Sequence, residues 1–150
     1  MLYYLAQVNI GKLLAPIDDP AIAEFVNQLD EMNQLAEKSP GFIWRLKEGE
    51  NSSVHATVYD DPLLKMNLSV WRSIDDLKSY AYQSDHLKVL KDRGKWFAKM
   101  KEPHLALWWH PVGDLMPDAN EAKKRLDHLN HYGPTGKAFT FRKIFPMPVV

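Results

Sequence analysis

The sequence contains no cysteine, which excludes disulfide bonds, thiolate catalysis and iron–sulfur ligation by this chain. It also has no apolar run near the ~20 residues that a helix needs to cross a bilayer. No charge of one sign dominates, because 19 Lys and Arg balance 19 Asp and Glu, and no basic stripe indicates a nucleic-acid partner. The opening residues, MLYYLAQVNI, lack the charged n-region and cleavage site of a signal peptide. We therefore expect a cytoplasmic protein with neither a membrane nor a nucleic-acid partner.

What the sequence does contain is ordinary for a globular protein. The chain has 150 residues, of which 45% are apolar and 25% are charged. This length is enough to bury one sizeable core. We expect a single domain over residues 1–150, with a core at 1–111 and a C-terminal extension at 112–150.

Alternating apolar and polar residues predict strands, and apolar stripes at helical spacing predict helices. The expected strands cover 2–9, 42–46, 66–71, 104–110 and 138–145, with a hairpin or flap at 54–59. The expected helices cover 20–36, 73–81, a further run to about residue 100, and 117–132. Asp19 and Ser73 are candidate N-caps, and Gly133 is a candidate C-cap. The order through His110 is β-α-β-β-α-β, which predicts an α+β, ferredoxin-like antiparallel sheet with a C-terminal helix–strand extension.

Both helices of this topology lie on one face of the sheet, so the other face needs a cover. By alternation we place eight side chains on it: Gln7, Asn9, Trp44, Asn67, Ser69, Trp71, Trp108 and His110. Three tryptophans alone bring roughly 450–750 Å² of surface, more than the ~300–600 Å² of the largest patch on a typical monomer. Either a second subunit or the third helix could cover this face. We favour a homodimer, because two-fold pairing is the commonest form of self-association.

The polar residues among these tryptophans predict an enclosed, partly polar cavity, because buried polar groups need partners. Aromatic walls with a few polar groups are typical of a pocket for a small apolar or aromatic ligand. They are equally typical of a dimer core.

Three short segments carry a resemblance to a known superfamily: Val70-Trp71-Arg72-Ser73, Asp75-Asp76-Leu77 and Ser84-Asp85-His86. A strand ending in Trp, a short acidic helix and a Ser-x-His segment resemble the dimeric α/β-barrel superfamily, which includes antibiotic-biosynthesis and haem-degrading monooxygenases. Through further segments, including Leu107–Pro111 and Ala138–Phe141, nearly the whole chain resembles a bacterial family described only as a domain of unknown function. The resemblance implies a dimeric α/β barrel.

The resemblance also implies a set of site residues. In the cofactor-free monooxygenases, an Asn on the first strand and a Trp after the third strand shape a pocket where a phenolic substrate reacts with oxygen. Asn9 and Trp71 take those places here. In the haem-degrading members, a His farther along the second helix ligates iron, whereas this chain has Leu90 in that region and His86 one turn earlier. We therefore require no cofactor and predict no metal site, and haem stays an open alternative.

We expect His86, Asn9 and Trp71 to be catalytic. A helix N-terminus disfavours a charged imidazole, so His86 would be neutral and able to accept a proton, although it could equally cap the helix. The expected substrate-binding residues are Gln7, Trp44, Asn67, Ser69, Trp108 and His110. For His110 the alternative is a purely structural role at a strand end. His128 and His131 have a spacing that permits metal binding, but a solvated helix end is favoured.

These observations lead to three hypotheses. The first is a monooxygenase-like enzyme that acts on a hydrophobic or aromatic small molecule in a barrel cavity, with His86 as proton acceptor. The second is a non-catalytic dimer that binds haem or another planar ligand. The third is a structural dimer whose cavity is filled by its own side chains.

Overall fold

The computed structural model describes residues 2–47, 58–59, 61–83, 92–99 and 104–148. Its strands are β1 (Tyr3–Lys12), β2 (Phe42–Arg45), β3 (Leu64–Trp71) and β4 (Leu105–Pro111), and its α-helices are α1 (Ala23–Lys38), α3 (Ile74–Gln83) and α5 (Ala119–Tyr132). Short 3₁₀ turns cover Pro20–Ile22 and Arg93–Lys95. The order of the strands and the two helices between them is the predicted β-α-β-β-α-β.

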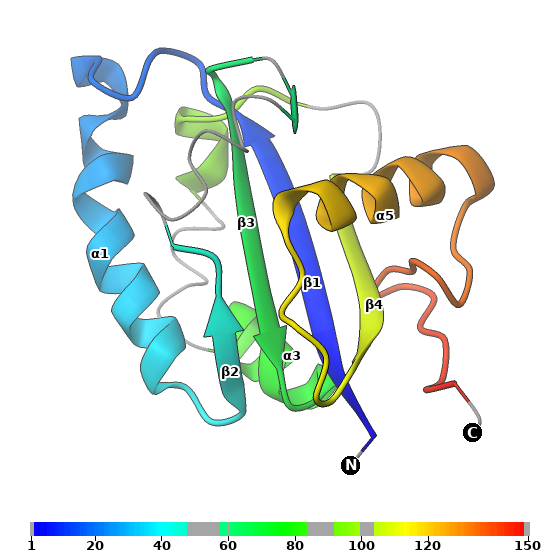
Figure 1. Ribbon diagram of the computed structural model, residues 1–150. Helices are drawn as coiled ribbons and strands as arrows, with labels where there is room; N and C mark the ends of the chain where they lie inside the picture. The colour runs from blue at the N-terminus through cyan, green and yellow to red at the C-terminus, as the bar shows by residue number, and fades with distance from the viewer. Residues whose placement is uncertain (1, 48–57, 60, 84–91, 100–103, 149–150) are drawn as a thin grey trace.

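The four strands form one antiparallel sheet in the order β2-β3-β1-β4 (Figure 1). β1 is the longest strand and lies in the middle, hydrogen-bonded to β3 on one side and to β4 on the other. The predicted α+β class and antiparallel sheet are therefore confirmed. Within the described residues, no helix is long and apolar enough to cross a membrane.

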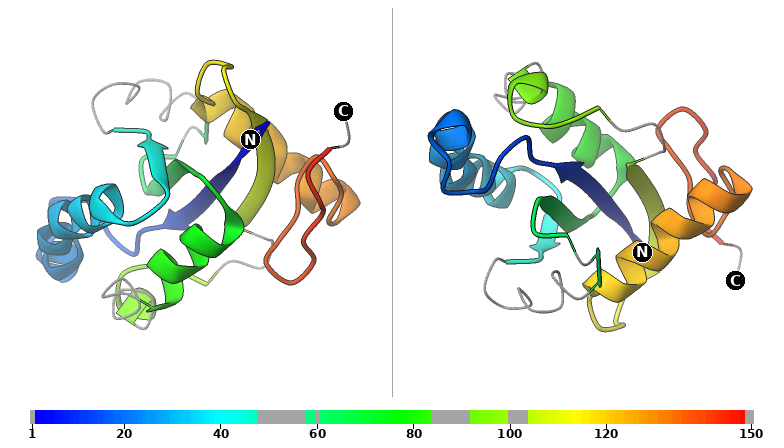
Figure 2. Two further views of the ribbon diagram at one scale, coloured as in Figure 1. Left: turned by 90° about the horizontal axis from the view of Figure 1, so that it is seen from below. Right: turned by 90° about the horizontal axis from the view of Figure 1, so that it is seen from above.

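Helices cover both faces of this sheet. Figure 2, which looks along the layers, shows α1 and α3 on one side of the strands and α5 on the other. We call these the α1/α3 face and the α5 face. The helix of the C-terminal extension is therefore part of the core packing and lies across the face that the sequence argument left bare.

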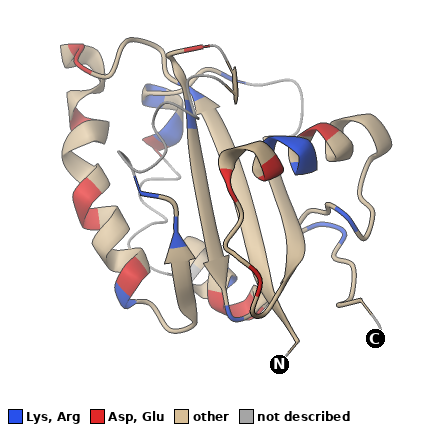
Figure 3. Cartoon of the chain, in the orientation of Figure 1, with Lys and Arg blue, Asp and Glu red and all other residues tan. Residues whose placement is uncertain are grey.

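Each face has its own apolar core. On the α5 face, Val8, Val70 and Trp108 pack with Leu126 and Leu129 of the helix. The core of the α1/α3 face includes the following buried residues: Leu5, Ala36, Trp71, Leu77, Leu107 and Phe139. Charged side chains gather on the helices and connections, and the strands are nearly free of them (Figure 3).

The predicted caps explain where the helices begin and end. Asp19 Oδ1 accepts from the backbone N–H of Ala21 at 2.8 Å, at the start of the 3₁₀ turn that leads into α1. Ser73 Oγ accepts from the backbone N–H of Asp76 at 3.1 Å at the start of α3. α5 ends at Gly133, whose φ of 74° suits a residue without a side chain.

The predicted last strand, 138–145, is wrong. Phe139 alone joins the edge of β4, through two backbone hydrogen bonds of 2.8 Å with Leu107. Isolated bridges join Thr135 to Ala138 and Thr140 to Lys143, so the chain turns on both sides of Phe139 instead of running straight. Alternation of apolar residues is shared by such a folded-back segment and a true strand.

Two further predictions fall largely on residues that the structure does not describe. The hairpin or flap at 54–59 is described only at its last two residues, which are helical. Of the helical run that was expected to extend to about residue 100, the structure describes 92–99, where a single 3₁₀ turn precedes Trp96.

Candidate functional site

A row of polar side chains crosses the middle of the α1/α3 face. Gln7 and Asn9 of β1 lie opposite Ser69 and Asn67 of β3 in the antiparallel register. Because alternate residues of a strand share a face, all four side chains project to the same side. We call these four residues, together with Trp71, the polar row.

The members of the row are linked by hydrogen bonds. The Gln7 side-chain amide donates to Asn67 Oδ1 and to Ser69 Oγ, both at 2.7 Å. Its Oε1 accepts from Asn9 Nδ2 at 3.1 Å, and Trp71 Nε1 donates to Ser69 Oγ at 2.9 Å. Gln7 thus uses both of its amide hydrogens and its oxygen, which offsets the cost of burying this side chain at 4% exposure.

Trp71 closes the inner end of the row. Tyr80 of α3 stacks on its ring, with centroids 5.1 Å apart and planes at 27°, and Phe42 meets it edge-on at 5.5 Å. Trp71 is only 1% exposed. Its ring is therefore occupied by neighbouring side chains, and its polar edge holds Ser69 in place.

Tyr80 is a site residue that the sequence analysis did not name. Its hydroxyl donates to the backbone oxygen of Met32 in α1 at 3.3 Å, which ties the two helices together above Trp71. Burial raises the pKa of Tyr80 to about 12, and the charge of Arg45 acts in the opposite direction. The apolar spacing of α3 could have indicated that Tyr80 points inward, but not that Tyr80 stacks on Trp71.

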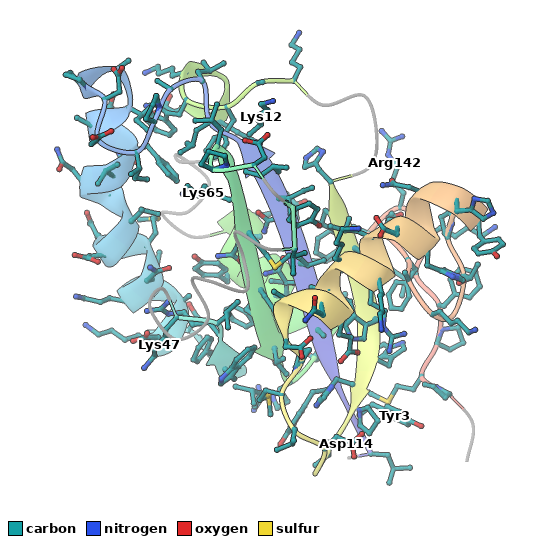
Figure 4. All side chains as sticks on the ribbon, turned by 45° about the horizontal axis from the view of Figure 1, so that its top comes forward. Tyr3, Lys12, Lys47, Lys65, Asp114 and Arg142 are labelled. Atoms are coloured by element: carbon teal, nitrogen blue, oxygen red, sulfur yellow. The ribbon has the colours of Figure 1, made fainter. Side chains whose placement is uncertain are left out.

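The outer end of the row has hydrogen-bonding capacity left over. Asn67 is exposed and Asn9 is partly buried. Among the hydrogen bonds of the described residues, none uses Asn67 Nδ2 or Asn9 Oδ1. Lys12 and Lys65, labelled in Figure 4, mark the end of the β1–β3 pair that lies beyond these two amides. The row therefore presents one donor and one acceptor where it meets solvent.

The predicted site residues are divided between the two faces, so the prediction that all of them share the face opposite α1 and α3 is wrong. The polar row lies under α1 and α3, and only Trp44, Trp108 and His110 lie on the opposite, α5 face. Trp108 pairs with Ala6 and His110 with Tyr4, and these β1 residues point away from Gln7. Trp44 pairs with Val70 after an irregularity in the β2–β3 register. Alternation within one strand does not define which residue lies opposite on the next strand, and a one-residue difference reverses the face.

Trp108 and His110 are covered by the chain itself. Trp108 is fully buried in the core that includes Leu126 of α5, and the Arg125 guanidinium carbon lies 5.5 Å from its ring centroid. His110 is 4% exposed. Trp108 Nε1 and His110 Nε2 have no hydrogen-bond partner within the described part of the chain. The α5 face therefore contains a packed core where a second subunit was expected.

A family model described as a domain of unknown function (DUF3291) matches residues 4–150. The chain belongs to the DUF3291 family. This confirms the resemblance of nearly the whole sequence to a domain of unknown function. No curated protein matches the chain.

Three solved structures are similar to this DUF3291 chain, each with a TM-score of 0.47. A protein of unknown function from Nitrosomonas europaea is 11% identical and covers 79% of this chain and 97% of its own. SnoaB, a cofactor-independent oxygenase from Streptomyces nogalater, is 15% identical, covering 77% and 99% respectively. A putative antibiotic biosynthesis monooxygenase from Nitrosomonas europaea is 13% identical, covering 79% and 97%. At such identity the function has to be argued from the chain's own residues.

The histidines of this DUF3291 protein do not form a common centre in the part that the structure describes. His128 Nε2 lies 2.8 Å from Thr135 Oγ1, a contact that closes the turn after α5, and His131 is exposed. Over the described ranges, no group of three or more His, Asp and Glu side chains is placed to hold a metal. His86 lies outside the described residues, so its catalytic role stays a prediction.

Proposed function

We propose that this DUF3291 protein binds a hydrophobic, ring-containing small molecule at the polar row and acts on it as a monooxygenase-like enzyme. One observation carries the proposal. Neutral polar side chains are joined by hydrogen bonds on a helix-covered sheet face, and the row ends in an unused donor and acceptor. Such a few fixed polar groups in apolar surroundings are typical of small-molecule sites.

The row is suited to orient an oxygen atom of the ligand. Asn67 Nδ2 can donate to a carbonyl or phenolate oxygen, and Asn9 Oδ1 can accept from a hydroxyl group. Gln7 holds both amides through its own hydrogen bonds, so little side-chain freedom is lost when the ligand binds. The row contains no charged group, which favours a neutral ligand in its resting state.

The reaction that fits this arrangement is oxidation of a phenol by molecular oxygen. Removal of the phenolic proton gives an electron-rich phenolate. Replacement of a ring C–H by C=O then yields a quinone, with one oxygen atom in the product and the other in water. The reaction balances as phenol plus O₂ to quinone plus water, so it needs no separate reductant. His86, the proton acceptor predicted from the sequence, would complete this chemistry.

The test uses 1-naphthol as a fused-ring phenol. Calorimetric titration measures binding, and an oxygen electrode with product absorbance measures conversion to the quinone. Asn67→Ala removes one neutral hydrogen bond of roughly 0.5–1.5 kcal/mol, so we expect the affinity to fall by about 2- to 12-fold. Asn130→Ala, at an exposed position on α5, is the matched control and should bind as the unaltered protein does.

Failure of 1-naphthol and related fused-ring phenols to bind would overturn the proposal, as would equal binding by Asn67→Ala. Binding without oxygen uptake would support the alternative, a non-catalytic binding protein. A haem titration would test the same alternative, because a Soret band that His86→Ala or His110→Ala abolishes would identify an axial ligand.

The homodimer stays a prediction from the sequence. Its original reason, a bare tryptophan-bearing face, no longer holds because α5 covers Trp108. Light scattering on the purified protein measures the assembly state directly.

A further inference from the structure

Arg93 is a partly buried cation that pairs with no anion among the described residues. Its Nη2 donates to the backbone oxygen of Ile10 at 3.2 Å, and its guanidinium carbon lies 4.8 Å from the Phe97 ring centroid. Across the residues that the structure describes, no carboxylate pairs with it. Burial lowers the pKa of this guanidinium, because desolvation disfavours its charged form.

Two acidic groups, one next to Arg93 in the sequence and one paired with the residue that follows Gly11, are already engaged. Asp92, its neighbour in sequence, pairs with Lys95 at 3.5 Å. Asp61 pairs with Lys12 of β1 at 3.3 Å. Neither carboxylate is therefore placed to satisfy Arg93, and a buried charge without compensation is costly.

The position of Arg93 is determined by a close approach to β1. A Cβ atom at Gly11 would lie 2.6 Å and 2.8 Å from two ring carbons of Phe97 and 3.0 Å from Arg93 Nη2. Only a residue without a side chain allows the ring and the guanidinium to lie against the strand in this way. The Phe97 ring and the Arg93 guanidinium thus both pack against the backbone of β1 at Gly11.

An open pocket of about 370 Å³ adjoins these groups. Its described lining consists of Arg93, Gly94, Phe97, Ala98, Lys99 and His104. The lining combines a guanidinium, an ammonium group and an aromatic ring, and none of these described residues is acidic. The volume lies at the lower end of the range for small-molecule sites.

We infer that this pocket binds a small organic oxyanion, a carboxylate or phosphate group carried on an apolar body. A guanidinium has five N–H donors in a planar fork, and only the one on Ile10 is used by a hydrogen bond within the described structure. The remaining N–H donors of the guanidinium can bind two oxygens of a carboxylate or phosphate in a bidentate contact. Phe97 offers an apolar wall for the rest of the ligand, and exposed Lys99 adds attraction for an anion. This site uses none of the polar row and does not depend on the proposed oxygenase activity.

Calorimetric titration tests the inference with three probes: benzoate, inorganic phosphate and benzamide as the neutral counterpart of benzoate. We expect Arg93→Gln to weaken binding of the anion at least tenfold, because a charge-assisted bidentate contact is lost. Arg142→Gln is the matched control, since Arg142 is an exposed arginine of the segment after α5, labelled in Figure 4. Its anion affinity should equal that of the unaltered protein, and benzamide should bind far more weakly than benzoate.

The two anions also separate the ligand classes. Binding of benzoate alone would assign a carboxylate on a ring, and binding of phosphate alone would assign a phosphate group. Arg93→Lys distinguishes loss of the bidentate contact from a folding defect. It retains the positive charge and a donor for the backbone oxygen of Ile10, but it lacks the planar set of guanidinium donors. We expect an intermediate affinity with an unchanged circular dichroism spectrum. Failure of both anions to bind, equal binding by a folded Arg93→Gln variant, or equal binding of benzamide would each overturn the inference.

Discussion

Removing the Leu126 side chain should show how firmly α5 holds the sheet. Leu126 is 2% exposed and packs in the same core as Val8, Val70 and Trp108. A buried Leu→Ala change costs roughly 2–5 kcal/mol, made up of lost transfer free energy and the cavity left behind. We expect about 3 kcal/mol for Leu126→Ala, a large share of the ~5–15 kcal/mol that stabilises a typical domain.

Urea unfolding followed by circular dichroism measures this effect. With a denaturant slope of about 2 kcal/mol per molar, a loss of 3 kcal/mol lowers the midpoint by about 1.5 M. Lys124→Ala is the control, because Lys124 is exposed on the same helix and lysine and alanine are both good helix formers. Its midpoint should change little.

Equal midpoints for Leu126→Ala and Lys124→Ala would refute the packing of α5 on the sheet. The dependence on protein concentration adds a second criterion. If the folded chain is a monomer, the midpoint is independent of concentration. A midpoint that rises with concentration would show that a partner chain contributes to stability.

Three further outcomes are expected. Ser69→Ala should lower the free energy of unfolding by about 1–3 kcal/mol, because two buried N–H donors lose their acceptor; an unchanged urea midpoint would contradict this. Gly11→Ala should destabilise by about 1–3 kcal/mol, since the added carbon would lie 2.6 Å from an aromatic carbon. Gly94→Ala, which meets nothing within 4 Å, is its control in the same unfolding assay. Burial raises the pKa values of Tyr59 and Tyr80 from 10.0 to about 12. The stability that Tyr80 contributes is therefore complete below pH 10 and declines as the pH rises toward 12, by up to ~1.4 kcal/mol per pH unit. The decline from Tyr59 is smaller, because solvent screens this less buried side chain. Urea midpoints at rising pH check this decline, and Tyr80→Phe should make it shallower.

Local features of this fold could be predicted from the sequence because their causes are local. The caps at Asp19 and Ser73 depend on one side chain and the backbone two or three residues ahead. The alternation of Gln7 and Asn9 against Ala6 and Val8 depends only on the geometry of a single strand. The grouping of the polar row within β1 and within β3 was predicted in this way, although the prediction placed the row on the face opposite the one that α1 and α3 cover.

Whether Trp108 shares a face with Gln7 could not be predicted, because it depends on how two distant strands pair. The register sets Trp108 opposite Ala6, which puts the indole under α5 and away from Gln7. The position of α5 itself is equally non-local. Small residues at Ala6 and Ala122 allow the helix to approach the sheet, but their sequence signal is no different from that of any apolar stripe.

The strict division of β1 between two environments has a consequence for how this chain can vary. Its even-numbered side chains Ala6 and Val8 belong to the core beneath α5, and its odd-numbered amides Gln7 and Asn9 belong to the opposite side. Deleting or inserting one residue between Asn9 and Lys12 would shift the preceding part of β1 by one position and exchange the two sets, placing amides in a dry helix–sheet contact. Length changes should therefore be tolerated in the exposed connection at 112–115 but not in the second half of β1, where substitution is the only route to a new binding preference.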